Sequence, residues 1–120
     1  MAELRAVAAE IELLQRTYAA FNRREIEIVL SGMHDNVDWP NGWEGGRALG
    51  KAAVRDYWKR QFEVLDPRVE PTDFRWEADG RIAVTVHQVV RDVDGRLLVD
   101  QVIQHVYEIR DGLIQSMEIR

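Results

Sequence analysis

The last third of the chain reads R-I-A-V-T-V-H-Q-V-V-R-D-V-D-G-R-L-L-V-D-Q-V-I-Q-H-V-Y-E-I-R-D-G-L-I-Q-S-M-E-I-R, residues 81–120. It is rich in β-branched residues, and Asp-Gly pairs interrupt it at 94–95 and 111–112. Asp-Gly is typical of tight hairpin turns, because glycine adopts a positive φ at little cost. The pattern predicts strands over 81–92, 97–110 and 113–120.

Upstream of this stretch, residues 69–77 have the same strand-like composition, and Ala78-Asp79-Gly80 separates them from residue 81. Four strands joined by short turns form an antiparallel meander, since each strand lies beside its predecessor.

The first 65 residues show helical spacing instead. From Glu3 to Phe21 one apolar face recurs every three or four positions, at Leu4, Val7, Ala8, Ile11, Leu14, Tyr18 and Phe21. Asn22 and Glu25 fit a capping box for a second, short helix that ends near Gly32. A brief strand is expected over 37–39, and a third helix over 50–65 that Pro67 ends. The prediction is one α+β domain over residues 1–120, with three N-terminal helices packed in a curved antiparallel sheet.

Composition excludes several classes of function. The net charge of −5, with scattered Lys and Arg, argues against a nucleic-acid partner. The absence of cysteine excludes disulfides, a thiol nucleophile and thiolate metal sites. Acidic residues appear early and no apolar run approaches the roughly 20 residues of a membrane helix. We therefore expect a cytoplasmic protein with no membrane partner.

The connection N-V-D-W-P-N-G-W-E-G-G, residues 36–46, concentrates large rings among glycine and proline. Trp39 and Trp43 lie on it, together with the polar residues Asp38 and Asn41. Loops carried by a rigid scaffold are where binding groups usually lie, so this loop is predicted to form the mouth of a pocket.

Alternation along residues 97–109 predicts two different sheet faces. Gln101, His105 and Tyr107 share a parity with mostly apolar neighbours, so they would face an apolar cavity inside the domain. A neutral imidazole there accepts or donates a proton near neutral pH. The opposite parity also carries apolar residues, Leu98 and Val102. This predicts that a second subunit covers this face to form a homodimer.

The order of these elements resembles the ketosteroid isomerase-like superfamily, also called nuclear transport factor 2-like or SnoaL-like. Three stretches carry the resemblance: Y-A-A-F-N-R-R-E-I-E-I-V-L-S-G-M-H-D-N-V-D-W at 18–39, G-G-R-A-L-G-K-A-A-V-R-D-Y-W at 45–58 and H-V-Y-E-I-R-D-G-L-I-Q-S-M-E-I at 105–119. The resemblance implies a cone-shaped α+β barrel whose curved sheet wraps around the helices and leaves an internal pocket. The same cone serves isomerases, cyclases, dehydratases and proteins without catalytic activity, so it does not assign a reaction.

The catalytic residues of the steroid isomerases carry over only in part. Tyr18 falls where that family keeps the tyrosine that donates to the substrate oxyanion. The isomerase base aligns with Trp39, before Pro40, and Asp38 is displaced by one residue to the opposite face. The third isomerase residue, a protonated aspartate, has no equivalent that we can place.

Two functions stay open. The first is a pocket for a small hydrophobic carbonyl-type molecule, with cofactor-independent isomerase, cyclase or dehydratase chemistry in which His105 or Asp38 acts as acid or base. In this interpretation the remaining candidates bind or enclose the substrate: Tyr18, Trp39, Asn41, Trp43, Tyr57, His87 and Gln101. The second is a non-catalytic ligand-binding or dimerisation module. No metal or cofactor is expected, because the histidines lack ligand spacing and no phosphate-binding loop is present.

Overall fold

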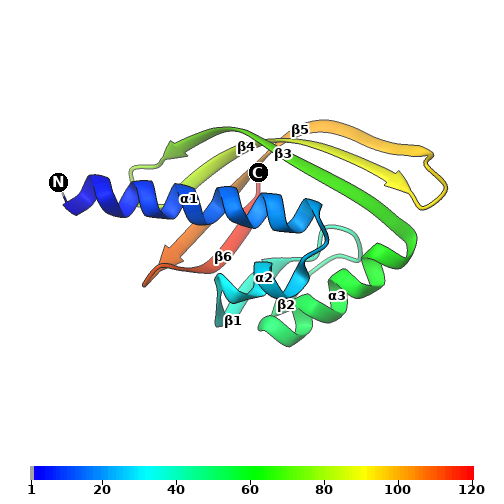
Figure 1. The fold of residues 1–120 in the computed structure, drawn as a ribbon, viewed down its shortest axis with the longest axis horizontal. Coiled ribbons are helices and arrows are strands. Elements are labelled where there is room, and N and C mark those ends of the chain that lie inside the picture. Colours follow the sequence, from blue (N-terminus) through cyan, green and yellow to red (C-terminus); the bar gives the residue numbers. More distant parts are fainter. Residues whose placement is uncertain (1) are drawn as a thin grey trace.

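Three helices lie against one side of a curved sheet in the computed structural model, which describes residues 2–120 apart from the side chains of residues 2–4 and 6 (Figure 1). The helices are α1 (Ala2–Asn22), α2 (Ile26–Ser31) and α3 (Lys51–Val64). The strands are β1 (Met33–Pro40), β2 (Arg47–Leu49), β3 (Leu65–Trp76), β4 (Ile82–Asp92), β5 (Leu97–Arg110) and β6 (Leu113–Ile119). The predicted α+β class is confirmed; Leu4, one of the predicted apolar residues, lies outside the described side chains.

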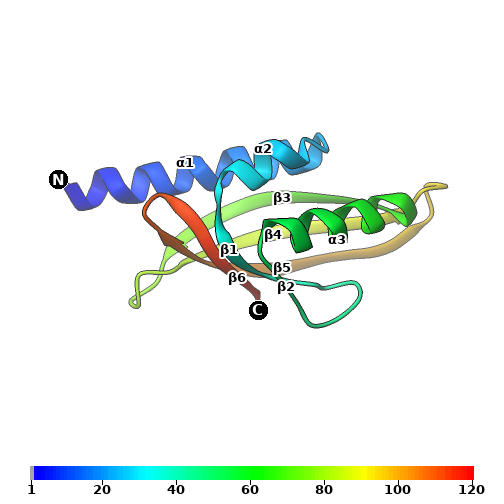
Figure 2. The same cartoon turned by 90° about the horizontal axis from the view of Figure 1, so that it is seen from below.

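The sheet has six strands in the order β2-β1-β6-β5-β4-β3 and does not close into a barrel. The predicted meander is confirmed, since β3, β4, β5 and β6 pair in sequence and antiparallel. The sheet is not wholly antiparallel, however, because β1 pairs with β6 in parallel. A parallel pair needs a long crossover, and here the chain between them supplies α3 and most of the meander. Figure 2 shows α1 and α3 on the same side of this sheet.

Several boundaries differ from the sequence prediction. β1 begins at Met33 instead of residue 37, because its pairing with β6 starts there, and the short strand β2 was not predicted. β3 begins at Leu65 and contains Pro67 and Pro71. Prolines are tolerated in it because β3 forms an edge of the sheet, where no neighbouring strand needs their N–H groups. No helix within residues 2–120 has the length and apolarity needed to cross a membrane.

The core fills the space between the helices and the concave face of the sheet. Its fully buried side chains come from α1, α2, α3 and every strand of the curved wall between β1 and β4: Leu14, Val29, Leu30, Met33, Val37, Val54, Ile82, Val84, Val86, Tyr107 and Ile114. The turn glycines have the positive φ that the Asp-Gly pattern predicts, 90° at Gly95 and 77° at Gly112.

Asn22 does not cap the second helix, contrary to the capping-box prediction. Glu25 is the N-cap of α2, and it makes no side-chain capping bond. The Asn22 amide instead clamps β3: its Nδ2 donates to the carbonyl of Val69 at 2.8 Å, and its Oδ1 accepts from the Val69 N–H at 3.0 Å. Asn22 therefore joins the end of α1 to the edge strand.

We predict that Asn22→Ala destabilises the fold by roughly 1–3 kcal/mol, because two backbone groups of β3 lose their partner. Chemical denaturation measures the change. Glu25→Ala is the control and should cost less than about 0.5 kcal/mol, because its half-exposed side chain makes only a surface ion pair with Arg23. An equal loss in the two variants would restore the capping-box interpretation.

Candidate functional site: a cavity under the curved sheet

A cavity of about 340 Å³ lies between the helices and the concave face of the sheet. Residues of α1, α2, α3, β1, β3, β4, β5 and β6, and of the loop after β1, line it. In the described part of the chain this lining contains aromatic, aliphatic and neutral polar residues, and no Asp, Glu, Lys or Arg. A volume of this size fits a small organic molecule.

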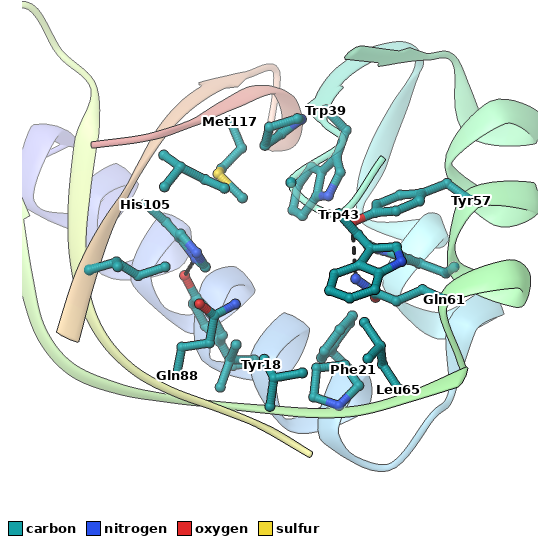
Figure 3. A pocket seen from close by; sticks show the side chains of 18 of the residues that line it. Tyr18, Phe21, Trp39, Trp43, Tyr57, Gln61, Leu65, Gln88, His105 and Met117 are labelled. Carbon is teal, nitrogen blue, oxygen red and sulfur yellow. Dashed lines mark hydrogen bonds between the residues drawn. The ribbon is translucent and has the colours of Figure 1, made fainter. Parts of the chain in front are cut away.

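Two sides of the cavity carry polar groups. Figure 3 shows His105, Tyr18 and Gln88 on one side, and Tyr57, Gln61 and Trp43 on the opposite side. The other labelled residues that surround the opening are hydrophobic: Trp39, Met117, Phe21 and Leu65. Trp39 and Trp58 meet edge to face, with ring centroids 5.6 Å apart.

A chain of three buried side chains forms the first polar side. The Tyr107 hydroxyl donates to the Tyr18 hydroxyl at 2.8 Å, and the Tyr18 hydroxyl lies 2.8 Å from Nδ1 of His105. All three residues are less than a tenth exposed. The Tyr18 and His105 rings stack, with centroids 5.9 Å apart.

The tautomer of His105 follows from counting donors. If Tyr107 donates to Tyr18 and Tyr18 donates to Nδ1, both hydroxyl hydrogens are paired and the imidazole proton sits on Nε2. The reverse direction would leave the Tyr107 hydrogen without an acceptor among residues 2–120, which is costly for a fully buried group. The favoured state is therefore a neutral imidazole with an Nε2–H donor available to the cavity.

Burial keeps His105 neutral. It lowers the pKa of His105 from 6.5 to about 4, because an imidazolium loses its hydration in this apolar site. Burial likewise raises the pKa values of Tyr18 and Tyr107, so neither tyrosine ionises near neutral pH. At neutral pH these three side chains are therefore uncharged and act through hydrogen bonds.

The second polar side contains an unpaired buried atom. Nε2 of Gln61 donates to the Tyr57 hydroxyl at 3.0 Å. Oε1 of Gln61 is buried and has no hydrogen-bond partner within the described chain. Buried polar atoms are normally satisfied, so this amide oxygen is an exception among the described residues.

The loop over 41–46 places Trp43 at the rim. Arg60 of α3 holds Glu44 with two bonds of 2.9 and 2.8 Å, and Asn41 accepts from the Glu44 N–H at 2.7 Å. The bonds from Arg60 and Asn41 lower the pKa of Glu44 to about 2. Trp43 lines the cavity while about half of its surface stays exposed.

Six of the nine residues singled out from the sequence line the cavity: Tyr18, Trp39, Trp43, Tyr57, Gln101 and His105. The other three do not, and their placement corrects the expectation that they face a substrate. Asn41 is buried within its own loop, where it binds Glu44. Asp38 points to the opposite face of β1 from Trp39 and pairs with Arg47 at 2.7 Å.

His87 lies on the outer face of the sheet. Its neighbour Gln88 faces the cavity opposite Gln101, so alternation turns His87 outward. There its Nε2 lies 2.7 Å from the carboxylate of Asp100. It is separated from the cavity by the sheet itself.

Sequence reasoning missed three polar residues of the lining, Thr17, Gln61 and Gln88. Gln61 follows Tyr57 by one helical turn, a spacing that places both on one face of α3 and could have indicated it. Gln88 shares its parity with the apolar Ile82, Val84 and Val86, so alternation along β4 could have indicated that it faces the cavity.

The family model for the SnoaL-like domain matches residues 14–117. The chain belongs to the SnoaL-like family. Its fold is the nuclear transport factor 2-like α+β fold, as the sequence resemblance predicts.

Solved structures agree with this SnoaL-like assignment. TerC, co-crystallised with polyporic acid, is 32% identical, with a TM-score of 0.80 over 93% of this chain and 90% of that one. An NTF2-like protein of unknown function from Burkholderia pseudomallei is 24% identical, with a TM-score of 0.81 over 93% and 89%. A candidate polyketide cyclase from Pseudomonas putida is 20% identical, with a TM-score of 0.80 over 92% and 90%. The last two share the fold alone, and no curated protein sequence matches this chain.

We predict that acidification destabilises this SnoaL-like domain through His105. Between pH 6.5 and 4 the unfolded state binds a proton that the folded state excludes, so the unfolding free energy is complete above pH 6.5 and falls toward pH 4. The loss is roughly 3 kcal/mol. Urea denaturation across this window measures it.

His105→Gln removes the titrating group but can still accept from Tyr18, so its unfolding free energy should change less over the same window. Parallel pH profiles for the two proteins would contradict the assignment. Glu44 is lowered in pKa from 4.5 to about 2, so its own contribution begins to fall near pH 4.5, but it does so equally in the two proteins and leaves their difference to His105.

Proposed function

We propose that this protein binds a small, neutral and largely apolar molecule in the cavity, and that an oxygen of this molecule accepts a hydrogen bond from Nε2 of His105. The observation that carries the proposal is the Tyr107–Tyr18–His105 chain, which ends in a donor at the cavity wall. The lack of charged residues in the described lining favours a neutral ligand, since an ion would lose its hydration without a counter-charge.

This geometry supports a donor role for His105 better than a role as general base. Nε2 carries the proton in the favoured tautomer, and a pKa of about 4 makes the imidazole a weak proton acceptor. Asp38, the other catalytic candidate, faces away from the cavity and pairs with Arg47. Within the described chain the lining offers no carboxylate to abstract a proton.

Catalysis at such a site would work by stabilising negative charge that develops on a carbonyl oxygen. A cyclisation or dehydration through a polarised carbonyl has this requirement and needs no cofactor. The alternative, ligand binding without turnover, uses the same contacts. Two observations favour ligand binding, which both functions require: the described lining has no carboxylate base, and the 32% identical TerC was crystallised with polyporic acid.

We predict that the simple aryl ketone 4-acetylbiphenyl binds with a saturable heat in isothermal titration calorimetry. His105→Leu should weaken the affinity for 4-acetylbiphenyl about tenfold, because one hydrogen bond in an apolar site is lost. His105→Gln, which keeps an N–H donor, should recover part of this loss.

His87→Leu is the matched control, since this histidine faces outward, and it should bind the ketone as the unmodified protein does. Equal affinities for His105→Leu and His87→Leu would remove His105 from the site. If the folded protein does not bind the ketone, the ligand-binding proposal is contradicted and the dimerisation-module alternative is favoured.

We also propose that the outer face of the sheet associates with a second copy to form a homodimer. Val102 lies at the centre of this face on β5 and is 68% exposed, and Leu98 on the same strand is 42% exposed. Exposed apolar side chains on a sheet face are typical of an interface.

Light scattering should therefore give the mass of a dimer, and Val102→Glu should give a monomer, because the charge would be buried at the interface. Leu49→Glu is the matched control, since Leu49 is also 68% exposed but lies on the edge strand β2. A monomeric unmodified protein, or an equal effect of both substitutions, would contradict the proposal.

A further inference from the structure

A second polar group lies on the wall that carries His105. Gln88 of β4 and Gln101 of β5 are direct cross-strand partners, and both line the cavity. Nε2 of Gln101 donates to Oε1 of Gln88 at 2.9 Å. The two amides thus form one unit on the concave face of the sheet.

This unit keeps one donor and one acceptor free. Nε2 of Gln88 and Oε1 of Gln101 make no hydrogen bond to any residue of the described chain. A hydroxyl group complements such a pair, because it accepts from an amide N–H and donates to an amide oxygen. The amides are neutral, so they fit a hydroxyl better than an ion.

The spacing along β5 sets the length of a molecule that reaches both groups. Gln101 and His105 are four residues apart and face the same side, with Ile103 between them. At about 3.3 Å per residue their backbones lie roughly 13 Å apart. Side chains that extend toward each other shorten this span, and a molecule of two linked rings covers it.

The walls between the two groups are aromatic. Tyr57 and Trp58 of α3 line the cavity on the helical side, and Trp39 of β1 and Ile103 of β5 line it on the sheet. Aromatic walls favour flat ring systems, which gain from stacked and edge-to-face contacts.

We infer that the cavity is a two-ended site for an elongated, neutral biaryl-type molecule. A carbonyl oxygen at the inner end accepts from Nε2 of His105, and a hydroxyl at the outer end pairs with Gln88 and Gln101. This inference rests on the proposed function and adds to it the length of the ligand, its second polar group and the role of Gln88 as a specificity-determining residue.

Three probes separate the two ends in isothermal titration calorimetry. 4-Acetyl-4′-hydroxybiphenyl carries both groups, 4-acetylbiphenyl lacks the hydroxyl, and 4-hydroxyacetophenone is too short to reach both ends. The unmodified protein should bind 4-acetyl-4′-hydroxybiphenyl about tenfold more tightly than 4-acetylbiphenyl. It should bind 4-hydroxyacetophenone most weakly. Equal affinities for the two biphenyls would overturn the inference while leaving the proposed function intact.

Gln88→Leu should reduce the ratio of the two biphenyl affinities from about tenfold to near one, and Gln101→Leu provides an independent second variant. Gln104→Leu is the matched control, because Gln104 lies on the same strand with the opposite parity and interacts with Arg120; it should keep the ratio. A tenfold ratio that persists in both Gln88→Leu and Gln101→Leu would overturn the inference. Absence of saturable binding by all three probes would overturn the proposed function and the inference together.

Discussion

The structure depends on burying a neutral imidazole. His105 lies inside the domain with its Nδ1 bonded to Tyr18, and Tyr18 is bonded in turn to Tyr107. Tyr18 comes from α1 and the other two residues from β5, so the bonds also fix the first helix against the middle of the sheet. Because each hydroxyl is used once as a donor and the chain ends on the ring, the imidazole is held in one tautomer. The same contacts that stabilise the core thereby orient a polar group at the cavity wall.

The carboxylates near the cavity do not add charge to its described lining. The carboxylates near the cavity are engaged elsewhere: Asp38 with Arg47 on the far face of β1, and Glu44 with Arg60 beside the loop. What faces the cavity is a set of amides, hydroxyls and rings. Such a lining selects ligands by shape and by the placement of hydrogen-bonding groups, since its described residues carry no charge that could pair with a ligand.

Periodicity and turn chemistry were enough to predict the helices, the meander and the parity of β5. The Asp-Gly pairs located the hairpins, and alternation from Tyr107 back to Gln101 identified the cavity face. The predictions failed where distant segments meet. The parallel pairing of β1 with β6 lengthens β1 toward Met33, and no local pattern encodes it. Counting from the Asp92–Arg96 pair that closes this hairpin would pair Gln88 with Asp100, but the irregularity between Val90 and Arg91 shifts the register and pairs it with Gln101.

The two edges of the sheet limit how this protein associates with others. Pro67 and Pro71 remove two N–H groups from the free edge of β3, and β2 at the opposite edge has only three residues. An approaching strand would find few backbone partners at either border, a feature that protects β proteins from ordered aggregation. Further strands therefore cannot readily add to the sheet at β3 or at β2. Contact with another chain is thus directed to side chains on the broad surface, where the partner can be chosen by shape.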